Sequence, residues 1–310
     1  MAEKEAKSPE ELSIWSDAHQ MINKAKKENI ETVWDRFEDQ NPGCKFCEQG
    51  LTCQKCTMGP CRITPGKERR QRGVCGADAD LTVARNFGRF VAGGAAAHSD
   101  HGRDLVDTQI AIGKGETEDY HIRDGEKLKR IAQEVGLLTD DKDEKTIALE
   151  LGQVFVDDFG FGNDNVSFAA RVPEKRKEIW EKLGISPRGI DRDVVEMMHR
   201  THMGVDSDPA SICLHAARVS LGDGWGGSMI GTELSDIIFG TPTPNTAEVN
   251  LGVLKEGHVN ILVHGHSPIV SEMILAAAND SELVEQAKNA GAEGINIAGL
   301  CCTGNEVLMR

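Results

Sequence analysis

Amphipathic helical patterns occupy most of the first 240 residues of the chain. Ser8, Pro9 and Glu11 make a helix-start signal, with Ser8 as N-cap, Pro9 in the first turn and Glu11 completing a capping box. Apolar residues then recur at helical spacing and predict one helix to about residue 28. A second helix is predicted through Val33 and Phe37, before a loop that runs from about residue 42 to 76.

A long helix is predicted from Asp78 to about Asp107. Its Gly-Gly-Ala-Ala-Ala segment at 93–97 has no large side chain, so another backbone or a cofactor can come close to it. The pattern stays helical from 124 to 222, and no strand alternation is found there. The expected core positions of this stretch are Leu128/Ile131, Ile147/Leu151, Ile179/Leu183 and Val194/Met198.

The pattern changes near residue 240, where Thr-Pro-Thr-Pro at 241–244 marks a linker. A short apolar strand is predicted at 259–263, helices follow at about 267–278 and 281–290, and a second buried strand at 295–300. This strand–helices–strand order is the opening of a parallel α/β sheet.

The expected fold class is therefore α followed by α/β, in two domains: a helical domain at 1–240 that carries the 42–76 loop, and an incomplete α/β domain at 241–310. Hydrophobic residues make up 39% of the chain and charged residues 27%, as in soluble globular proteins. No apolar stretch is long enough for a membrane span. The formal charge of −15 argues against nucleic-acid binding, and the polar N-terminus favours a cytoplasmic location.

Cysteines are concentrated in the predicted loop. Six of the nine lie in one 32-residue window: Cys44, Cys47, Cys53, Cys56, Cys61 and Cys75. Four cysteines complete one iron–sulfur cluster, so two remain as half of a second ligand set. A symmetric dimer completes that set with two cysteines from each subunit on its twofold axis. The first hypothesis is an iron–sulfur protein that dimerises through a shared cluster in a reducing, oxygen-poor compartment.

Two alternatives use the same cysteines. A disulfide framework is disfavoured because the chain shows no signal peptide. A zinc site remains an alternative, although only five residues separate Cys47 from Cys53, whereas the two pairs of a zinc ribbon are separated by about 15–20 residues.

A second group of candidate ligands follows the two predicted strands. His264 and His266 end the first strand, and Cys301 and Cys302 end the second. Parallel strands present their carboxyl ends at one edge, so an imidazole and a thiolate there are candidate metal ligands. The alternative is that His266 caps a loop and that the cysteines only pack; a metal site here also needs further ligands.

Proton-transfer candidates lie outside both groups. His98 and His101 are three residues apart on one face of the long helix, and neighbouring imidazoles can pass protons. Asp223 lies in a glycine-rich segment expected to be a flexible loop, where a carboxylate can accept a proton or orient water. A solvated helix face and an ordinary turn are the alternatives. Cys213, alone in an apolar helical setting, is expected in the core.

Taken in order along the chain, these motifs resemble one family. They are Cys53-x2-Cys56-x4-Cys61-x13-Cys75, the 91–103 segment with His98-Ser99-Asp100-His101, His264-Gly265-His266, and Cys301-Cys302-Thr303-Gly304-Asn305-Glu306. The combination resembles the nickel-dependent carbon monoxide dehydrogenases, which interconvert CO and water with CO2, two protons and two electrons. The resemblance implies a helical domain followed by Rossmann-like domains, a homodimer and a ferredoxin-like electron acceptor.

The resemblance also implies roles for the cysteines of the loop. Four of them would hold a [4Fe–4S] cluster: Cys53, Cys56, Cys61 and Cys75. Cys44 and Cys47 would be this chain's half of the cluster on the dimer axis, and their close spacing favours [2Fe–2S] over [4Fe–4S].

For the active site, the resemblance implies that His266 and Cys302 bind iron of a Ni–Fe–S cluster, with Cys301 assisting its assembly. His98 would be the acid/base near nickel, with Asp223 as second acid/base partner. His101 would begin the proton exit.

Two departures from the family are visible. Asp104 and Asp107 occupy positions where some members continue the histidine series, so carboxylates or water would share the exit path. The chain also ends at Arg310, far short of family members, so a C-terminal half or a completing polypeptide is expected to supply the remaining ligands. The rival hypotheses are a hybrid-cluster or hydroxylamine reductase, a non-catalytic electron-transfer module and a zinc-binding scaffold.

Overall fold

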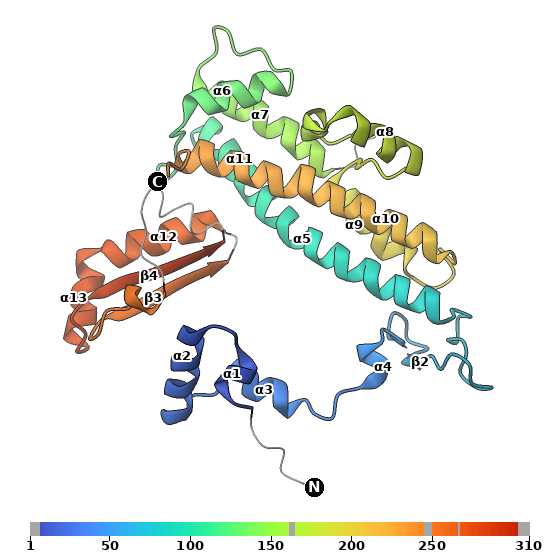
Figure 1. Ribbon diagram of the computed structural model, residues 1–310. Coiled ribbons are helices and arrows are strands. Elements are labelled where there is room, and N and C mark those ends of the chain that lie inside the picture. The colour runs from blue at the N-terminus through green and yellow to red at the C-terminus, as the bar shows by residue number, and fades with distance from the viewer. Residues whose placement is uncertain (1–6, 161–164, 245–249, 266, 303–310) are drawn as a thin grey trace.

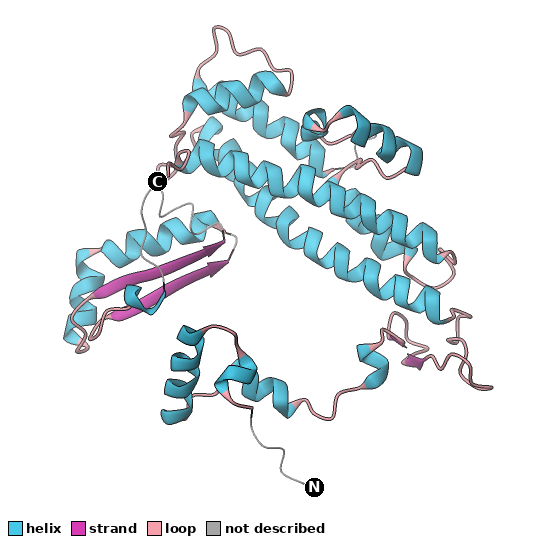
Figure 2. Ribbon diagram, viewed as in Figure 1, coloured by secondary structure: helices cyan, strands magenta, loops and turns pink. Residues whose placement is uncertain are grey.

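The computed structural model describes residues 7–160, 165–244, 250–265 and 267–302. Helices make up most of it, with two small two-stranded sheets (Figures 1 and 2). The N-terminal helices are α1 (Pro9–Leu12), α2 (Ser16–Lys27), α3 (Val33–Asp39) and α4 (Lys45–Glu48), followed by strands β1 (Thr52–Cys53) and β2 (Cys61–Arg62). Among the described residues, no helix is long and apolar enough to cross a membrane.

The helical unit follows the cysteine-rich loop. It consists of α5 (Ala79–Lys114), α6 (Gly125–Glu134), α7 (Glu144–Phe159), the 3-10 turn η1 (Ser167–Arg171), α8 (Glu174–Leu183), α9 (Ile190–Arg200), α10 (Pro209–Gly222), the π-helical segment η2 (Asp223–Gly227) and α11 (Ser228–Phe239). The last elements are η3 (Asn250–Val253), β3 (Val259–Gly265), α12 (Pro268–Asn279), α13 (Ser281–Asn289) and β4 (Ile295–Cys302).

The N-terminal helix signal is confirmed, but the helix is shorter than predicted. Ser8 and Glu11 form the capping box of α1. The chain then becomes extended at Ser13, whose side-chain oxygen accepts a hydrogen bond from the Trp15 N–H at 3.2 Å. A serine that bonds nearby backbone competes with the helix, so the predicted single helix is two helices, α1 and α2.

Helix α5 is the longest element and forms the axis of the helical unit (Figure 1). Asp78 caps it by accepting a hydrogen bond from the Leu81 N–H at 3.0 Å, and the left-handed Gly115 ends it. The prediction of a long helix from Asp78 is confirmed, with seven more residues at its C-terminal end. Helices α7, α9, α10 and α11 pack along it.

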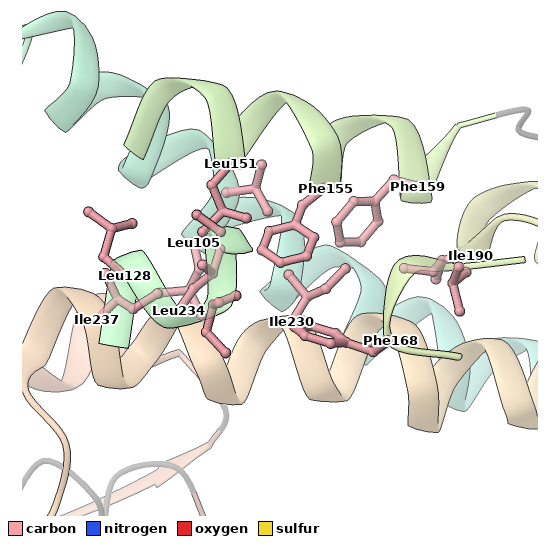
Figure 3. Close-up of a cluster of buried hydrophobic side chains, with 14 of the residues drawn as sticks. Leu105, Leu128, Leu151, Phe155, Phe159, Phe168, Ile190, Ile230, Leu234 and Ile237 are labelled. Carbon is pink, nitrogen blue, oxygen red and sulfur yellow. The ribbon is translucent and has the colours of Figure 1, made fainter. Parts of the chain in front are cut away.

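The main hydrophobic core lies between the C-terminal half of α5 and helices α6, α7 and α11 (Figure 3). Leu105, Leu128, Leu151 and Leu234 are completely buried there, and Phe155 packs against Phe168 with ring centroids 5.3 Å apart. A second, smaller core joins the N-terminal half of α5 to α9 and α10. Together the two cores fix α5, which carries His98 and His101, relative to α10 and α11, and η2 between these two helices carries Asp223.

One of the four predicted core pairs is wrong, and a second is right for only one of its two residues. Leu128/Ile131 and Ile147/Leu151 are buried as expected. On α8, however, Ile179 and Leu183 are exposed and Trp180 is buried against Trp225. On α9, Val194 packs against the smaller core as expected, but Met197 is buried where Met198 was predicted, and Met198 is exposed. Each of these helices has apolar residues on adjacent faces, so the periodicity leaves the buried face ambiguous by one position.

Strands β3 and β4 pair in parallel, and the helices α12 and α13 connect them, as the order of elements predicted. Ser267 caps α12, and its side-chain oxygen accepts a hydrogen bond from the Val270 N–H at 3.4 Å. The helical unit ends at Phe239, close to the predicted change at residue 240. The division into domains at 1–240 and 241–310 stays a prediction.

Candidate functional site

The cysteine loop folds around a very short antiparallel pair of strands. Cys53 on β1 lies directly opposite Cys61 on β2. Between them, the chain doubles back at Gly59, where a Cβ atom would lie 3.0 Å from the Cys53 carbonyl oxygen and 3.3 Å from the Cys61 nitrogen. A side chain at Gly59 would therefore push the strands apart. The turn brings two predicted ligands into register.

Cys61 and Cys75, the last two of the four predicted ligands, accept hydrogen bonds at their sulfur atoms. The Val74 N–H donates to Cys61 Sγ at 3.5 Å. The Ala77 N–H donates a hydrogen bond to Cys75 and lowers the pKa of its thiol. The buried Arg85 side chain, 3.7 Å from Cys75 Sγ, lowers it further. The six cysteines of the loop are free thiols. Thiolates held in this way are suited to bind iron, so the loop fits an iron–sulfur cluster.

Cys44 and Cys47 form a separate, exposed pair on α4. Hydrogen bonds from the Cys47 N–H, the Cys47 side chain and the Phe46 N–H lower the pKa of Cys44, and the Arg62 charge adds to this effect. Both thiols lie at the protein surface. This placement suits ligands that meet a second subunit.

His98 and Asp223 are in direct contact although they are 125 residues apart. His98 Nδ1 lies 2.8 Å from Asp223 Oδ1, and the Ser228 hydroxyl lies 3.2 Å from the same nitrogen and 3.3 Å from the same oxygen. The expected loop around Asp223 is wrong, because residues 223–227 form a π-helical turn that joins α10 to α11 without a break. A π-turn at a functional site is a recurring arrangement, since the extra residue re-aims the neighbouring side chains.

Small residues allow this contact between α5 and the π-turn. A Cβ atom on Gly102 would lie 2.8 Å from the Gly227 carbonyl oxygen, and one on Gly227 would lie 3.2 Å from the Ser99 nitrogen. His101 lies one turn along α5 from His98 and packs against Gly231, where a Cβ atom would be 3.3 Å from its ring. By contrast, Gly93 and Gly94 have nothing within 4 Å of a Cβ position, so no described residue comes close to these two glycines, whereas Ala95 of the same segment is buried in the smaller core.

Beyond His101, the same helix carries acidic residues. Burial raises the pKa of Asp104, and the negative charges of Asp100 and Asp107 raise it further. The positive charge of Arg103 acts in the opposite direction. Arg103 and Ser99 are both bonded to Asp191 of α9; Ser99 Oγ donates at 2.5 Å. Carboxylates therefore continue the row that begins with the two histidines.

The strand-end candidates are only partly described. In the parallel register, His264 pairs with Cys301, and Gly265 pairs with Cys302. The two cysteines are thus the last residues of β4, at the edge where β3 ends, as predicted. His266 lies outside the described residues.

A buried acidic cluster on α9 and α10 was not predicted. One atom each of Asp193, Glu196 and His215 lies within 4.8 Å of the others, a spacing suitable for a metal ion. However, Arg188 bonds to both carboxylates, and hydrogen bonds from Arg200 and Arg188 lower the pKa of Glu196 to about 2, although burial opposes this. The cluster is therefore an ion-pair network. The Glu196–Arg200 spacing of four residues was the available sequence signal.

Cys213 is also placed differently from its prediction, since it is exposed on α10 and not in the core.

Comparisons with known proteins show what the chain as a whole is similar to. Residues 51–310 match the model of the Prismane/CO dehydrogenase family. Carbon monoxide dehydrogenase 1 of Methanosarcina acetivorans is 52% identical over 97% of this chain and 48% of its own length. Carbon monoxide dehydrogenase 1 of Carboxydothermus hydrogenoformans is 47% identical over 92% of this chain and 45% of its own length.

Solved structures give the same result. A nickel-free crystal structure of carbon monoxide dehydrogenase from Thermococcus sp. AM4 has a TM-score of 0.91 and 50% identity, covering 99% of this chain and 49% of that one. The chain thus spans about half the length of the relatives it matches. On the family match over most of its residues and on these relatives, the chain belongs to the Prismane/CO dehydrogenase family.

Proposed function

We propose that the complete enzyme containing this chain is an anaerobic carbon monoxide dehydrogenase, which oxidises CO with water to CO2, two protons and two electrons in a reversible reaction. The similarity to carbon monoxide dehydrogenases over 97% of the chain, at 52% identity, carries this proposal. The contact between His98 and Asp223 supports it, because a reaction that releases protons needs groups that accept them.

The cysteine loop is proposed to hold the electron-carrying clusters. Cys53, Cys56, Cys61 and Cys75 would bind one [4Fe–4S] cluster; the paired strands and the hydrogen bonds to Cys61 and Cys75 support this assignment. The exposed Cys44 and Cys47 would bind a cluster shared with a second copy of the chain in a homodimer. We favour [2Fe–2S] over [4Fe–4S] for the shared cluster, and an electron acceptor of the ferredoxin type.

The edge at the ends of β3 and β4 is proposed as the active-site edge of a Rossmann-like domain. His266 and Cys302 would bind iron of a Ni–Fe–S cluster, with Cys301 assisting assembly; the parallel register of the two strands supports a common location. When bound, such a cluster supplies redox chemistry and a Lewis-acidic iron for activating water. The relatives are about twice as long, so we expect further ligands from residues beyond these 310.

His98 is proposed to take up and release a substrate proton. In the tautomer that donates from Nδ1 to Asp223, Nε2 is the nitrogen that accepts a proton. Asp223 then orients the ring, and the Ser228 hydroxyl, in contact with both groups, limits its rotation. His101, then Asp104 and Asp107, would carry protons away along α5, with the raised pKa of Asp104 suiting a carboxyl group that exchanges protons.

The test is made on the complete enzyme, purified without oxygen and with its metals retained. Native mass spectrometry is expected to show a dimer containing nickel, iron and sulfide, and CO is expected to drive the reduction of methyl viologen. Nickel-containing enzyme that does not respond to CO but reduces hydroxylamine would contradict the proposal and favour the hydroxylamine reductases. If the purified dimer contains iron and sulfide but no nickel, the result would contradict the proposal and favour a non-catalytic electron-transfer protein.

A further inference from the structure

Positive charge is concentrated next to the cysteines in an otherwise acidic chain. Residues 62–72, here called the basic loop, contain five cations and one acid, whereas the whole chain has a formal charge of −15. The cations are Arg62, Lys67, Arg69, Arg70 and Arg72, and all five are exposed. Among the described residues, none of the five forms an ion pair. Their charge is therefore available to a partner.

The basic loop has a defined shape. The Thr64 N–H donates to the Arg70 carbonyl oxygen at 2.8 Å, and the Thr64 hydroxyl donates to the Arg69 carbonyl oxygen at 2.6 Å. Ile63, next to Thr64, is completely buried and anchors the loop. The cationic side chains thus project from a closed turn, so a partner would order little backbone on binding.

The basic loop lies directly against the proposed cluster ligands. A surface pocket of about 370 Å³ is lined by Pro60, Cys61, Arg62, Arg70, Arg72 and Val74. Arg62 also lies near the second pair of cysteines, since its guanidinium is 5.8 Å from the centre of the ring of Phe46, which stands between Cys44 and Cys47 in the sequence. The basic loop thus lies beside Cys61 and, through Arg62, close to the proposed ligands of the shared cluster.

Exposed apolar side chains accompany these cations. Val74, whose N–H bonds to Cys61 Sγ, has 66% of its surface exposed, and Met58, between Cys56 and Cys61 in the sequence, has 47% exposed. Apolar groups bordered by charge are typical of protein interfaces, and weak electron-transfer complexes use small areas of this kind.

We propose that the basic loop, with Val74 and Met58, is the docking surface for an acidic one-electron carrier protein. The inference rests on the proposed function, which requires such a carrier. In the transfer, the carrier gains one electron that the enzyme loses, and no bond or proton changes place. Complementary charge would steer the carrier to this surface and raise its association rate at low ionic strength. Balancing the negative charge of a cluster would account for Arg62. It would not account for Lys67 and Arg69, which lie further along the turn.

The test measures binding and electron transfer separately. An acidic ferredoxin is titrated into the complete enzyme over a range of NaCl concentrations, with the triple variant Arg69→Glu/Arg70→Glu/Arg72→Glu for comparison. We expect the variant's Kd to rise at least about tenfold at low salt, and the difference to shrink as added salt screens the charges. CO-driven reduction of ferredoxin should fall similarly, and reduction of methyl viologen, a small dye that needs no docking, should not.

A matched control carries the same change of charge elsewhere. Lys175→Glu/Arg176→Glu/Lys182→Glu alters three exposed cations at α8, which lies far from the cysteine loop (Figure 1). Its ferredoxin Kd should stay within about twofold of the native value. An equal weakening in both triple variants would mean a general effect of net charge and would overturn the proposal.

Three other results would also overturn it. They are a native Kd that does not depend on salt, unchanged binding by the basic-loop variant, and dissociation of the dimer by that variant, which would assign the surface to a second copy. If the glutamate variant loses iron, Arg69→Gln/Arg70→Gln/Arg72→Gln replaces it, with a smaller expected rise in Kd. A native enzyme that binds ferredoxin in this salt-dependent way but does not respond to CO would refute the proposed function and leave the docking surface intact.

Discussion

The close contact of α5 with the π-turn gives a sharp prediction for two glycines of the same helix. At Gly102 an added Cβ atom would lie 2.8 Å from the Gly227 carbonyl oxygen and 3.2 Å from the Phe159 ring. At Gly94 the same atom would meet nothing within 4 Å. Gly102→Ala and Gly94→Ala therefore add the same methyl group to α5, but only Gly102→Ala creates a steric clash.

The expected magnitudes follow from two opposing effects. Replacing glycine by alanine inside a helix stabilises it by about 0.5–1 kcal/mol, and Gly94→Ala should gain this amount. Gly102→Ala gains the same but forces two backbones apart, and overpacking of this kind costs about 1–3 kcal/mol. The free energies of unfolding of the two variants should thus differ by about 1–3 kcal/mol, with Gly94→Ala the more stable.

The assay is urea unfolding of the 310-residue chain, followed by the helical circular dichroism signal. In the complete enzyme, Gly102→Ala should also reduce CO oxidation, because moving the π-turn away from α5 lengthens the 2.8 Å contact between His98 and Asp223. Equal stabilisation by both substitutions would refute the reasoning, since the backbones could not then be as close as the structure places them.

Two further predictions concern acidic residues. Asp223→Asn should lower CO oxidation by about 10²–10⁴-fold at unchanged nickel and iron content, because an amide can donate to Nδ1 and favour the wrong tautomer of His98; unchanged activity would remove Asp223 from the proposed mechanism. Burial raises the pKa of Asp158 to about 6 from 3.8, although the Ser167 N–H and hydroxyl donate to it at 3.0 and 3.1 Å. The folded chain then binds this proton more tightly than the unfolded chain, so this carboxyl group lowers the free energy of unfolding as pH rises from about 4 to 6, by at most about 3 kcal/mol. In urea unfolding of the metal-free proteins at several pH values, the free energy of unfolding should decrease less between about pH 4 and 6 in Asp158→Asn than in the native protein. The same pH dependence in the variant and the native protein would contradict the assignment.

Local signals predicted the fold well where a single element decides it. The cap at Ser8 and the helix starts at Asp78 and Ser267 are read from adjacent residues, and the parallel pairing of β3 and β4 follows from the order of elements. The burial of Trp180 in place of Ile179 depends on Trp225, which lies on a distant segment, so periodicity alone could not choose between them.

The candidate site shows the same limit. The cysteine spacing by itself indicates a metal-binding loop, and the residue types of His98 and Asp223 make each of them a candidate for proton transfer. Their partnership depends on the close packing of α5 against the π-turn, and the glycines at that contact, Gly102 and Gly227, lie more than 100 residues apart in sequence. The π-turn was mistaken for a loop, because glycine-rich sequence is more typical of turns than of helix interiors.

The π-turn also decides which residues of the rod from α10 to α11 share a face. In a regular α-helix, residues five positions apart are separated by about 140° around the axis, because each residue turns the chain by about 100°. In the π-turn the Ser228 N–H donates to the Asp223 carbonyl oxygen, so residues five positions apart lie one above the other. Asp223 and Ser228 can therefore both contact His98. The extra residue is taken up within one turn, so α11 continues α10 with nearly the rotation of an unbroken helix.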